Sequence, residues 1–282
     1  MVFTKVCLLL CKSQDMKSDY SYKIVMVGAG NVATHLAQAL VRAGHSVAQV
    51  WSRTSNSAEA LSTIVGAQPV TDIRNINTTA DVYIISVSDN ALAETARRLC
   101  SICDHGIFVH TSGTMSMDLF SAYTGQYGVL YPMQTFSRSK AVDFCRIPCF
   151  VEASDDNTLD VIRSIAMSIS AKVYDLAEED RRWLHLAAVF ACNFSNCCYT
   201  IADAILQKHG LAIDVMLPLI DETARKVHVM PPAMGQTGPA VRGDANVMGE
   251  QMSLLSGSAE LHDLYCAMSG IIAKFKQNET LI

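Results

Sequence analysis

A glycine-rich turn between an apolar strand and an amphipathic helix is the feature that most constrains this fold. Residues 23–27 read KIVMV, the continuous apolar run of a parallel strand buried on both faces. The turn GAGNVA at 28–33 follows and matches G-x-G-x-x-[GA]. Residues 31–43 then carry apolar side chains at helical spacing, and a second strand is expected at Ser46–Trp51. The sequence therefore predicts a βαβ unit built around the turn.

The chemistry of this turn suits a pyrophosphate. Gly28 permits the tight turn, Gly30 lets the backbone approach the phosphates, and Ala33 is small enough for the helix to pack on the strand. The free N–H groups and the dipole of the helix start attract an anion. We expect a dinucleotide here, with a purely structural turn as the alternative. The expected contact residues are Gly28, Ala29, Gly30, Asn31 and Val32.

The end of the second strand indicates which dinucleotide binds. NAD proteins usually carry an acid there for the ribose hydroxyls, but this chain reads Ser52-Arg53-Thr54, starting 24 residues after Gly28. A carboxylate would repel a 2′-phosphate, whereas two hydroxyls and a guanidinium can bind one. The sequence therefore predicts NADP(H) rather than NAD(H), although Arg53 as a solvated loop charge stays open.

Two further strand ends are expected to face the same crevice, since ligands of open α/β sheets bind at the carboxyl ends of the strands. The strand expected at 80–87 leads into Ser86, Val87 and Ser88, which we place near the nicotinamide side of the cofactor. The strand expected at 107–110 leads into His110 and Ser112. His110 has two open interpretations, a catalytic or cofactor-contacting ring and a hydrogen-bonded structural group.

Strands and helices alternate over about 150 residues, which predicts an α/β fold with a doubly wound, mostly parallel Rossmann sheet. After Asp175 the pattern becomes helical, and Asp175-Leu-Ala-Glu178 has the spacing of a capping box. Later helices are expected at 214–228, 245–256 and 259–277. The sequence thus predicts a disordered or dispensable extension (1–21), an NADP-binding Rossmann domain (22–176) and an all-helical substrate and dimerisation domain (177–282).

Composition excludes several classes of protein. Half of the 282 residues are apolar and 17% are charged, as in folded globular chains. The net charge is −5 without a basic tract, so no nucleic-acid partner is expected. No apolar run approaches the ~18–20 residues of a membrane span. Ten cysteines without an export signal indicate reduced thiols and a cytoplasmic protein. Cys100 and Cys103 lack a second pair at zinc spacing, so no metal site is expected.

The chain also resembles a known family. VGAGNVA, VWSRT, ISVSDNAL, VHTSGT, YPMQTF, RRWLHLAAVFACNFSN and QTGPAVRGD occur in this order over about residues 22–278. They look like bacterial NADP oxidoreductases that join a Rossmann-like domain to a helical domain of unknown function. That family is similar in plan to pyrroline-5-carboxylate reductase, ketopantoate reductase and the β-hydroxyacid dehydrogenases. The resemblance implies a C-terminal domain like that of 6-phosphogluconate dehydrogenase. Tyr131, in YPMQTF, stands where the resemblance leads us to expect His.

The first helix of the C-terminal domain carries the candidate catalytic residues. Arg181, His185 and Asn193 are spaced by four and eight on an otherwise apolar helix, so they lie near one stripe and need partners or a cavity. The resemblance to β-hydroxyacid dehydrogenases implies a Lys and an Asn on this helix, but His185 is the titratable group present. We expect His185 to move a proton, Asn193 to orient a carbonyl or imine, and Arg181 to bind a substrate carboxylate. The alternatives are a structural histidine, an asparagine that ties two helices together, and Arg181 or Arg182 as a surface charge against Glu178.

The loop QTGPAVRGD at 236–244 adds candidate substrate ligands, Thr237 and Arg242, although Arg242 has Asp244 as an alternative partner. Asp244 is also placed to cap the next helix. Together these patterns predict an NADPH-dependent oxidoreductase that acts on a small carbonyl or imine compound, as a homodimer through the helical domain. The alternative is an NADP(H)-binding sensor without turnover. The sequence names neither the substrate nor the direction of the reaction.

Overall fold

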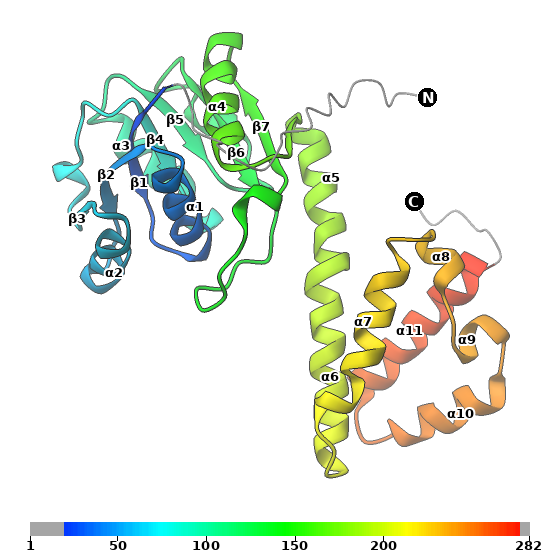
Figure 1. Cartoon of the computed structure of the whole chain (residues 1–282). Helices are drawn as coiled ribbons and strands as arrows, with labels where there is room; N and C mark the ends of the chain where they lie inside the picture. The colour runs from blue at the N-terminus through cyan, green and yellow to red at the C-terminus, as the bar shows by residue number, and fades with distance from the viewer. Residues whose placement is uncertain (1–19, 277–282) are drawn as a thin grey trace. The chain divides into compact units, whose positions relative to one another are not determined.

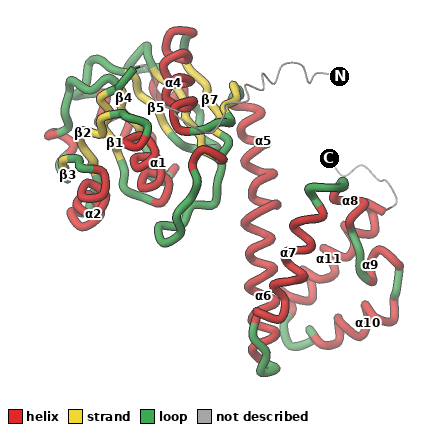
Figure 2. The backbone as a smooth tube through the Cα atoms, viewed as in Figure 1, coloured by secondary structure: helices red, strands yellow, loops and turns green. Residues whose placement is uncertain are grey.

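A computed structural model of the chain describes residues 20–276 (Figures 1 and 2). Nearly all of the expected N-terminal extension, 1–21, lies outside these residues. The first part of the chain forms one eight-stranded sheet in the order β3-β2-β1-β4-β5-β6-β7-β8. All neighbouring strands pair in parallel except β6 and β7, so the predicted doubly wound, mostly parallel sheet is confirmed. The strands are β1 (Lys23–Val27), β2 (Ser46–Trp51), β3 (Gln68–Val70), β4 (Val82–Ile85), β5 (Ile107–His110), β6 (Tyr127–Pro132), β7 (Cys149–Ala153) and β8 (Val173–Asp175).

Helices cover both faces of the sheet (Figure 1). α1 (Asn31–Arg42), α2 (Ser55–Val65) and α4 (Asp156–Ile169) pack on one face, while α3 (Asp89–Cys100) and a short 3-10 helix, η2 (Met117–Phe120), pack on the other. The strands between them are buried on both sides, which explains their unbroken apolar sequences.

The strand register brings the predicted loops to one edge of the sheet. Val27 pairs with both Trp51 and Ile85, and Ile85 pairs in turn with His110. The loops that follow β1, β2, β4 and β5 therefore begin side by side. Tyr131, one residue before the end of β6, lies at the same edge.

The sequence pattern did not predict strand β3. It has three residues, one of them Pro69, and pairs only with β2 at the sheet edge. Proline is tolerated in such an edge strand because no neighbour needs its N–H. A run this short has no periodicity that a sequence pattern can detect.

The capping box expected at the start of α5 (Glu178–Ala188) does not form. Asp175 is the last residue of β8, and its carboxylate binds Arg163 at 2.8 Å instead of a helix N–H. The N-cap is Ala177, and the backbone N–H of Glu178 donates to Glu152 Oε1 at 3.0 Å. A carboxylate on β7 therefore caps the helix from 26 residues away in the chain.

After α5 the helix continues through a π-helical turn (Val189–Phe194) into α6 (Ser195–Lys208). By length and composition alone this 31-residue helix could cross a membrane, although its apolar window is interrupted by polar residues such as Asn193 and is not one continuous apolar run. Core helices of soluble proteins meet the same criterion but are mostly buried, whereas 6% of the apolar window of this helix is buried. Phe190 and Phe194 are 61% and 50% exposed along it and contact each other edge to face.

The chain divides into two compact units with the break after Ser195, whereas the expected boundary near 176 marks the start of α5. All described elements of the second unit are helical. They are α6, η5 (Ile213–Met216), α7 (Leu217–Lys226), α8 (Pro232–Gly235), α9 (Pro239–Arg242), α10 (Ala245–Leu254) and α11 (Ala259–Lys276). Among the described residues of this unit only Leu206 and Ser269 are buried, so it has almost no core of its own.

Candidate active site

The glycine turn after β1 has the geometry that phosphate binding requires. Gly28 has φ +125°, and a Cβ there would lie 2.1 Å from the Ser86 carbonyl oxygen, so only glycine fits. A Cβ on Gly30 would meet nothing within 4 Å, which leaves the approach to the turn open. The N–H groups of residues 31–33 have no hydrogen-bond partner in the described part of the chain. The start of α1 therefore fits a dinucleotide pyrophosphate.

An arginine that the sequence analysis missed lies at the same turn. Three consecutive residues of the loop 133–143 bind the turn and the first part of α1. The Asn31 amide donates to the Phe136 carbonyl at 3.0 Å, and His35 Nε2 lies 2.9 Å from the Ser137 carbonyl. The Arg138 guanidinium donates to the Ala29 carbonyl. The loop thus brings a positive charge to the turn from 109 residues away in the chain.

The residues expected to select NADP(H) lie at the end of β2. Ser52 is anchored by a backbone hydrogen bond to Val70, and its hydroxyl lies 3.4 Å from the Thr54 amide, which places Thr54 at the start of α2. Arg53 is exposed, and its guanidinium forms no ion pair or hydrogen bond with any described residue. It is therefore free to bind a phosphate. Its role in cofactor selection stays a prediction.

The loops after β4 and β5 are joined by side-chain hydrogen bonds. Thr111 donates to the Ser86 hydroxyl at 3.0 Å, and Thr114 donates to Asp89 at 2.7 Å. The Ser112 hydroxyl is buried and accepts hydrogen bonds from the backbone N–H groups of Thr114 and Met115. The sequence predicted that the Ser112 side chain contacts the cofactor, but in the structure its hydroxyl is used within the turn. Val87 and Ser88 keep accessible side chains, and their predicted role is untested.

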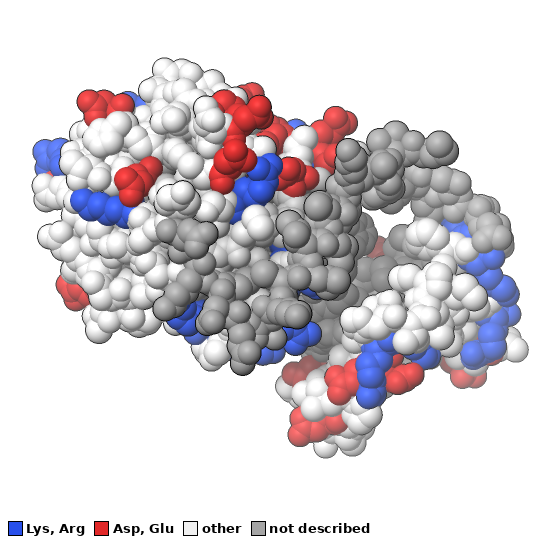
Figure 3. Space-filling view, turned by 45° about the horizontal axis from the view of Figure 1, so that its top comes forward, with Lys and Arg blue, Asp and Glu red and all other residues white. Residues whose placement is uncertain are grey.

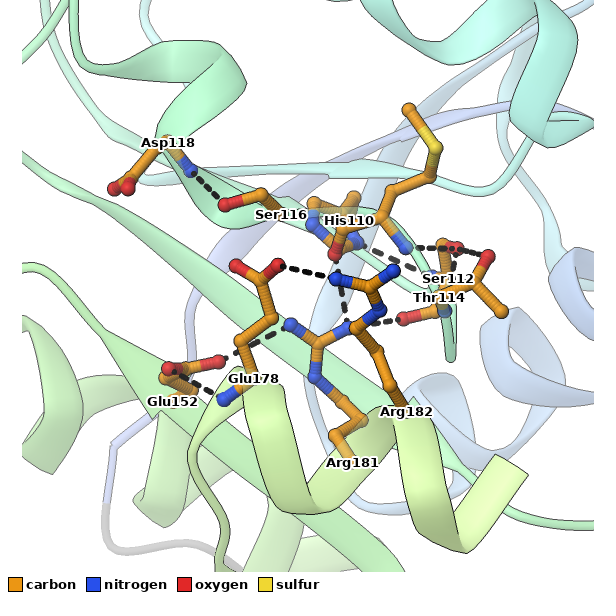
Figure 4. Close-up of polar contacts among 10 residues, drawn as sticks. His110, Ser112, Thr114, Ser116, Asp118, Glu152, Glu178, Arg181 and Arg182 are labelled. Carbon is orange, nitrogen blue, oxygen red and sulfur yellow. Dashed lines mark hydrogen bonds and ion pairs between the residues drawn. The ribbon is translucent and has the colours of Figure 1, made fainter. Parts of the chain in front are cut away.

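His110 is fully buried, and Figure 4 shows it beside Ser112. Its Nδ1 accepts the Ser112 backbone N–H at 3.1 Å. Burial, and then the nearby Arg181 charge, lower the pKa of His110 to about 3. The ring therefore stays neutral at physiological pH and is closed to ligands. Of the two interpretations left open by the sequence, the structure supports a hydrogen-bonded structural histidine. The buried side chain does not make the expected contact with a cofactor.

Arg181 is the second buried group that corrects an expectation (Figure 4). Its guanidinium is fully buried and donates to the carbonyls of Ser112 and Met115, at 3.1 and 2.9 Å, and to Glu152 at 3.1 Å. It therefore fastens α5 to the loop after β5 rather than binding a substrate carboxylate. The surface pair with Glu178 is formed instead by Arg182, at 3.8 Å.

His185 lies one turn after Arg181 on α5 and contacts Tyr131, which stands where the resemblance led us to expect His. The hydroxyl of Tyr131 lies 3.0 Å from His185 Nδ1. Tyr131 is 9% exposed, and burial raises the pKa of its phenol. Gly113 leaves room for this contact, because a side chain there would place its Cβ 2.5 Å from the same nitrogen. No local pattern signals the pair, because its members are 54 residues apart.

The other candidate residues are exposed. Asn193 lies in the π-helical turn, where the changed rotation per residue alters the stripe expected from α-helical spacing. Thr237 and Arg242 lie in the second unit, and no described ion pair joins Arg242 to Asp244. Asp244 instead accepts the Val247 N–H and caps α10, as predicted. Substrate contacts by Asn193, Thr237 and Arg242 stay predictions.

Comparisons with known proteins agree with this architecture. Residues 11–133 match a Rossmann-like domain, and residues 147–272 match a domain of unknown function, DUF2520. No curated protein matches the chain in sequence. In fold the chain is similar to an imine reductase from Myxococcus stipitatus in complex with NADP+ (13% identity, TM-score 0.62, 91% of this chain and 93% of that one). It is also similar to a pyrroline-5-carboxylate reductase from Coxiella burnetii (15%, TM-score 0.56, 93% and 100%).

A nearer relative is the crystal structure of "putative NADP oxidoreductase BF3122" from Bacteroides fragilis. Its sequence is 45% identical, its TM-score is 0.87, and the match covers 90% of this chain and 98% of that one. Sequence identity at this level, over nearly the whole length of the relative, shows membership of the same family and not only a shared fold. The chain therefore belongs to the family of this Bacteroides protein, in which a Rossmann-like domain is joined to a DUF2520 domain.

Proposed function

We propose that the protein is an NADPH-dependent oxidoreductase that transfers hydride to or from a small carbonyl or imine compound. The observation that carries the proposal is the open glycine turn at the start of α1, with unpartnered N–H groups for a pyrophosphate. The names of the relatives add support. One carries NADP oxidoreductase in its name, and the fold is shared with an NADP+-bound imine reductase.

In this proposal three groups hold the cofactor. The N–H groups of the turn and the Arg138 guanidinium bind the pyrophosphate, and Arg53 binds the 2′-phosphate. Arg53 has no described protein partner to give up, so it can form a two-point contact with a phosphate dianion. NADPH supplies the hydride, and the chain supplies orientation, a proton path and exclusion of water.

The proton path begins at His185. Its imidazole is held at the carboxyl edge of the sheet by Tyr131 and Gly113, at the edge where ligands of such sheets bind. We assign substrate orientation to Asn193, and recognition of a substrate carboxylate to Thr237 and Arg242. Fully buried Arg181 is left out of direct substrate contact.

The experiment is NADPH oxidation over a panel of keto acids and imino acids, with the wild type, His185→Ala and Asn193→Ala. We expect turnover with at least one compound and a loss of about 100-fold or more in His185→Ala, as for removal of a general acid. Equal turnover in the wild type and both variants would remove the catalytic assignment. Tight NADPH binding without any turnover would favour the alternative function, a non-catalytic NADP(H) sensor.

We also propose that the protein is a cytoplasmic homodimer paired through its helical part. The described cysteines are all free, in agreement with a reducing compartment. The apolar side chains exposed on the second unit and on the preceding helix need cover. A second copy of the chain can supply it.

A further inference from the structure

We propose that Tyr131 and His185 act as one proton-relay pair, in which His185 Nε2 meets the substrate and the Tyr131 phenol replaces the proton that the imidazole gives up. The inference deepens the proposed function and rests on it. It assigns a role to Tyr131 and specifies which imidazole nitrogen acts as the donor.

The pair is built by three separate elements. Tyr131 comes from the end of β6, His185 from α5, and Gly113 from the loop after β5. The phenol oxygen lies 3.0 Å from Nδ1, and the ring centroids are 6.0 Å apart. Because a Cβ on Gly113 would lie within 3.0 Å of both rings, the loop must be glycine at this point for the pair to form.

The hydrogen bond decides which nitrogen carries the proton. Burial raises the pKa of Tyr131, so its phenol keeps its proton, and in the proposed pair that proton is donated to Nδ1. An imidazole that accepts at Nδ1 carries its own proton on Nε2 when it is neutral. Nε2 has no hydrogen-bond partner among the described residues, and the His185 side chain is partly exposed. A donor is thus held in a fixed direction and is free to meet a ligand.

Reduction of a carbonyl compound to an alcohol adds one hydride and one proton to the substrate. The cofactor supplies a hydride, and its electron pair forms the new C–H bond. The Nε2–H bond breaks as its proton forms an O–H bond with the substrate oxygen. The phenol proton moves to Nδ1, which leaves a neutral imidazole and a tyrosinate. The Nδ1 proton then returns to the tyrosinate as a proton from solvent binds Nε2, which restores the starting pair. The products are the alcohol and the oxidised cofactor.

Burial raises the pKa of Tyr131 and disfavours the transient tyrosinate, but one nearby charge offsets part of this cost. The buried guanidinium of Arg181 acts on Tyr131 and lowers its pKa, which opposes part of the effect of burial. Arg181 lies one turn before His185 on the same helix and is fixed by Glu152 and two carbonyls. Its charge therefore stays in place while the proton moves.

The first test needs no turnover. Protein with isotope-labelled histidine is studied by NMR across pH, and His185→Gln identifies the signals of His185. We expect neutral His185 to be the Nε2–H tautomer in the wild type. In Tyr131→Phe we expect a mixture of tautomers. Tyr174→Phe is the matched control, because Tyr174 stacks on Phe150 in the same cluster without a hydrogen bond to His185. A wild-type His185 protonated at Nδ1, or Tyr131→Phe spectra equal to the wild type, overturns the pair.

The second test uses a compound that reacts in the panel. Tyr131→Phe is expected to lower kcat by about 10- to 100-fold while the NADPH dissociation constant stays unchanged, since the phenol lies outside the cofactor contacts. The rate in mixtures of H2O and D2O should curve for the wild type, where two protons move, and become linear for Tyr131→Phe. A linear wild-type dependence contradicts the relay. If no compound reacts, the proposed function fails, while the tautomer experiment still decides whether the pair exists.

Discussion

Two arginines have different roles in the proposed cofactor site, because each is assigned to a different charged group of the cofactor. Arg138 donates to the turn for which we propose pyrophosphate binding, and NADPH and NADH share that group. Arg53 lies at the end of β2, where only NADPH carries a phosphate. A substitution of Arg53 should therefore affect NADPH binding alone, whereas a substitution of Arg138 should affect the binding of both cofactors.

We predict that Arg53→Ala weakens NADPH binding by about 10-fold or more and leaves NADH binding nearly unchanged, because a charge-assisted phosphate contact contributes about 1.5–3 kcal/mol. Arg138→Ala should weaken both cofactors by a similar factor. Fluorescence titration of each variant with both cofactors measures this. Equal wild-type affinity for NADPH and NADH would contradict the role given to Arg53.

His110 provides a prediction about pH. Its pKa falls from the ordinary 6.5 to about 3 on folding, so between these values the unfolded chain binds a proton that the native chain excludes. The native state therefore loses stability as the pH falls from 6.5 towards 3, by up to about 1.4 kcal/mol per pH unit. Above pH 6.5 this loss is absent.

His110→Asn keeps an acceptor for the Ser112 N–H but cannot be protonated. Urea unfolding at pH 4.5 to 8 should give a shallower dependence of stability on pH for this variant than for the wild type. His209→Asn, an exposed histidine, serves as the control with the wild-type slope. Parallel curves for the wild type and His110→Asn would show that His110 does not titrate as described.

At the scale of single elements, prediction succeeded where the signal is local. The strand and helix around the glycine turn, and the cap of α10 by Asp244, depend on neighbours within a few residues, and the structure confirms them. The start of α5 was wrong because its cap, Glu152, comes from another strand. For the same reason the sequence left two interpretations of His110 open and did not predict the burial of Arg181, since burial depends on the packing of distant segments and not on spacing along the chain.

The cap of α10 is directly testable. Asp244→Ala removes the acceptor for the Val247 N–H and should lower the free energy of unfolding by about 1 kcal/mol. Asp244→Asn keeps the acceptor and should cost much less. Denaturation followed by far-UV circular dichroism gives both values, with Asp221→Ala on α7 as the control. A loss in Asp244→Asn as large as in Asp244→Ala would show that charge rather than capping matters.

For the whole molecule, the contrast between the two units suggests how the protein assembles. The sheet unit has apolar clusters on both of its faces, whereas the described part of the second unit buries only Leu206 and Ser269. Figure 3 shows the charged residues of the drawn face in small groups separated by uncharged surface. Helices with so little buried surface are marginal alone, because helix stability in proteins comes mainly from packing of an apolar face.

We therefore predict a dimer whose helices form a shared core. Light scattering after size exclusion should give twice the chain mass, and the melting temperature should rise with protein concentration, since dissociation accompanies unfolding. Phe190→Glu and Leu219→Glu place a charge on side chains that are 61% and 63% exposed, and should shift the protein to monomer with a lower melting temperature. Tyr123→Glu, on a side chain 49% exposed in the sheet unit, should leave the dimer intact. A wild-type protein that stays monomeric at every concentration, or is recovered in membranes, would contradict this assembly and leave these apolar side chains needing another cover.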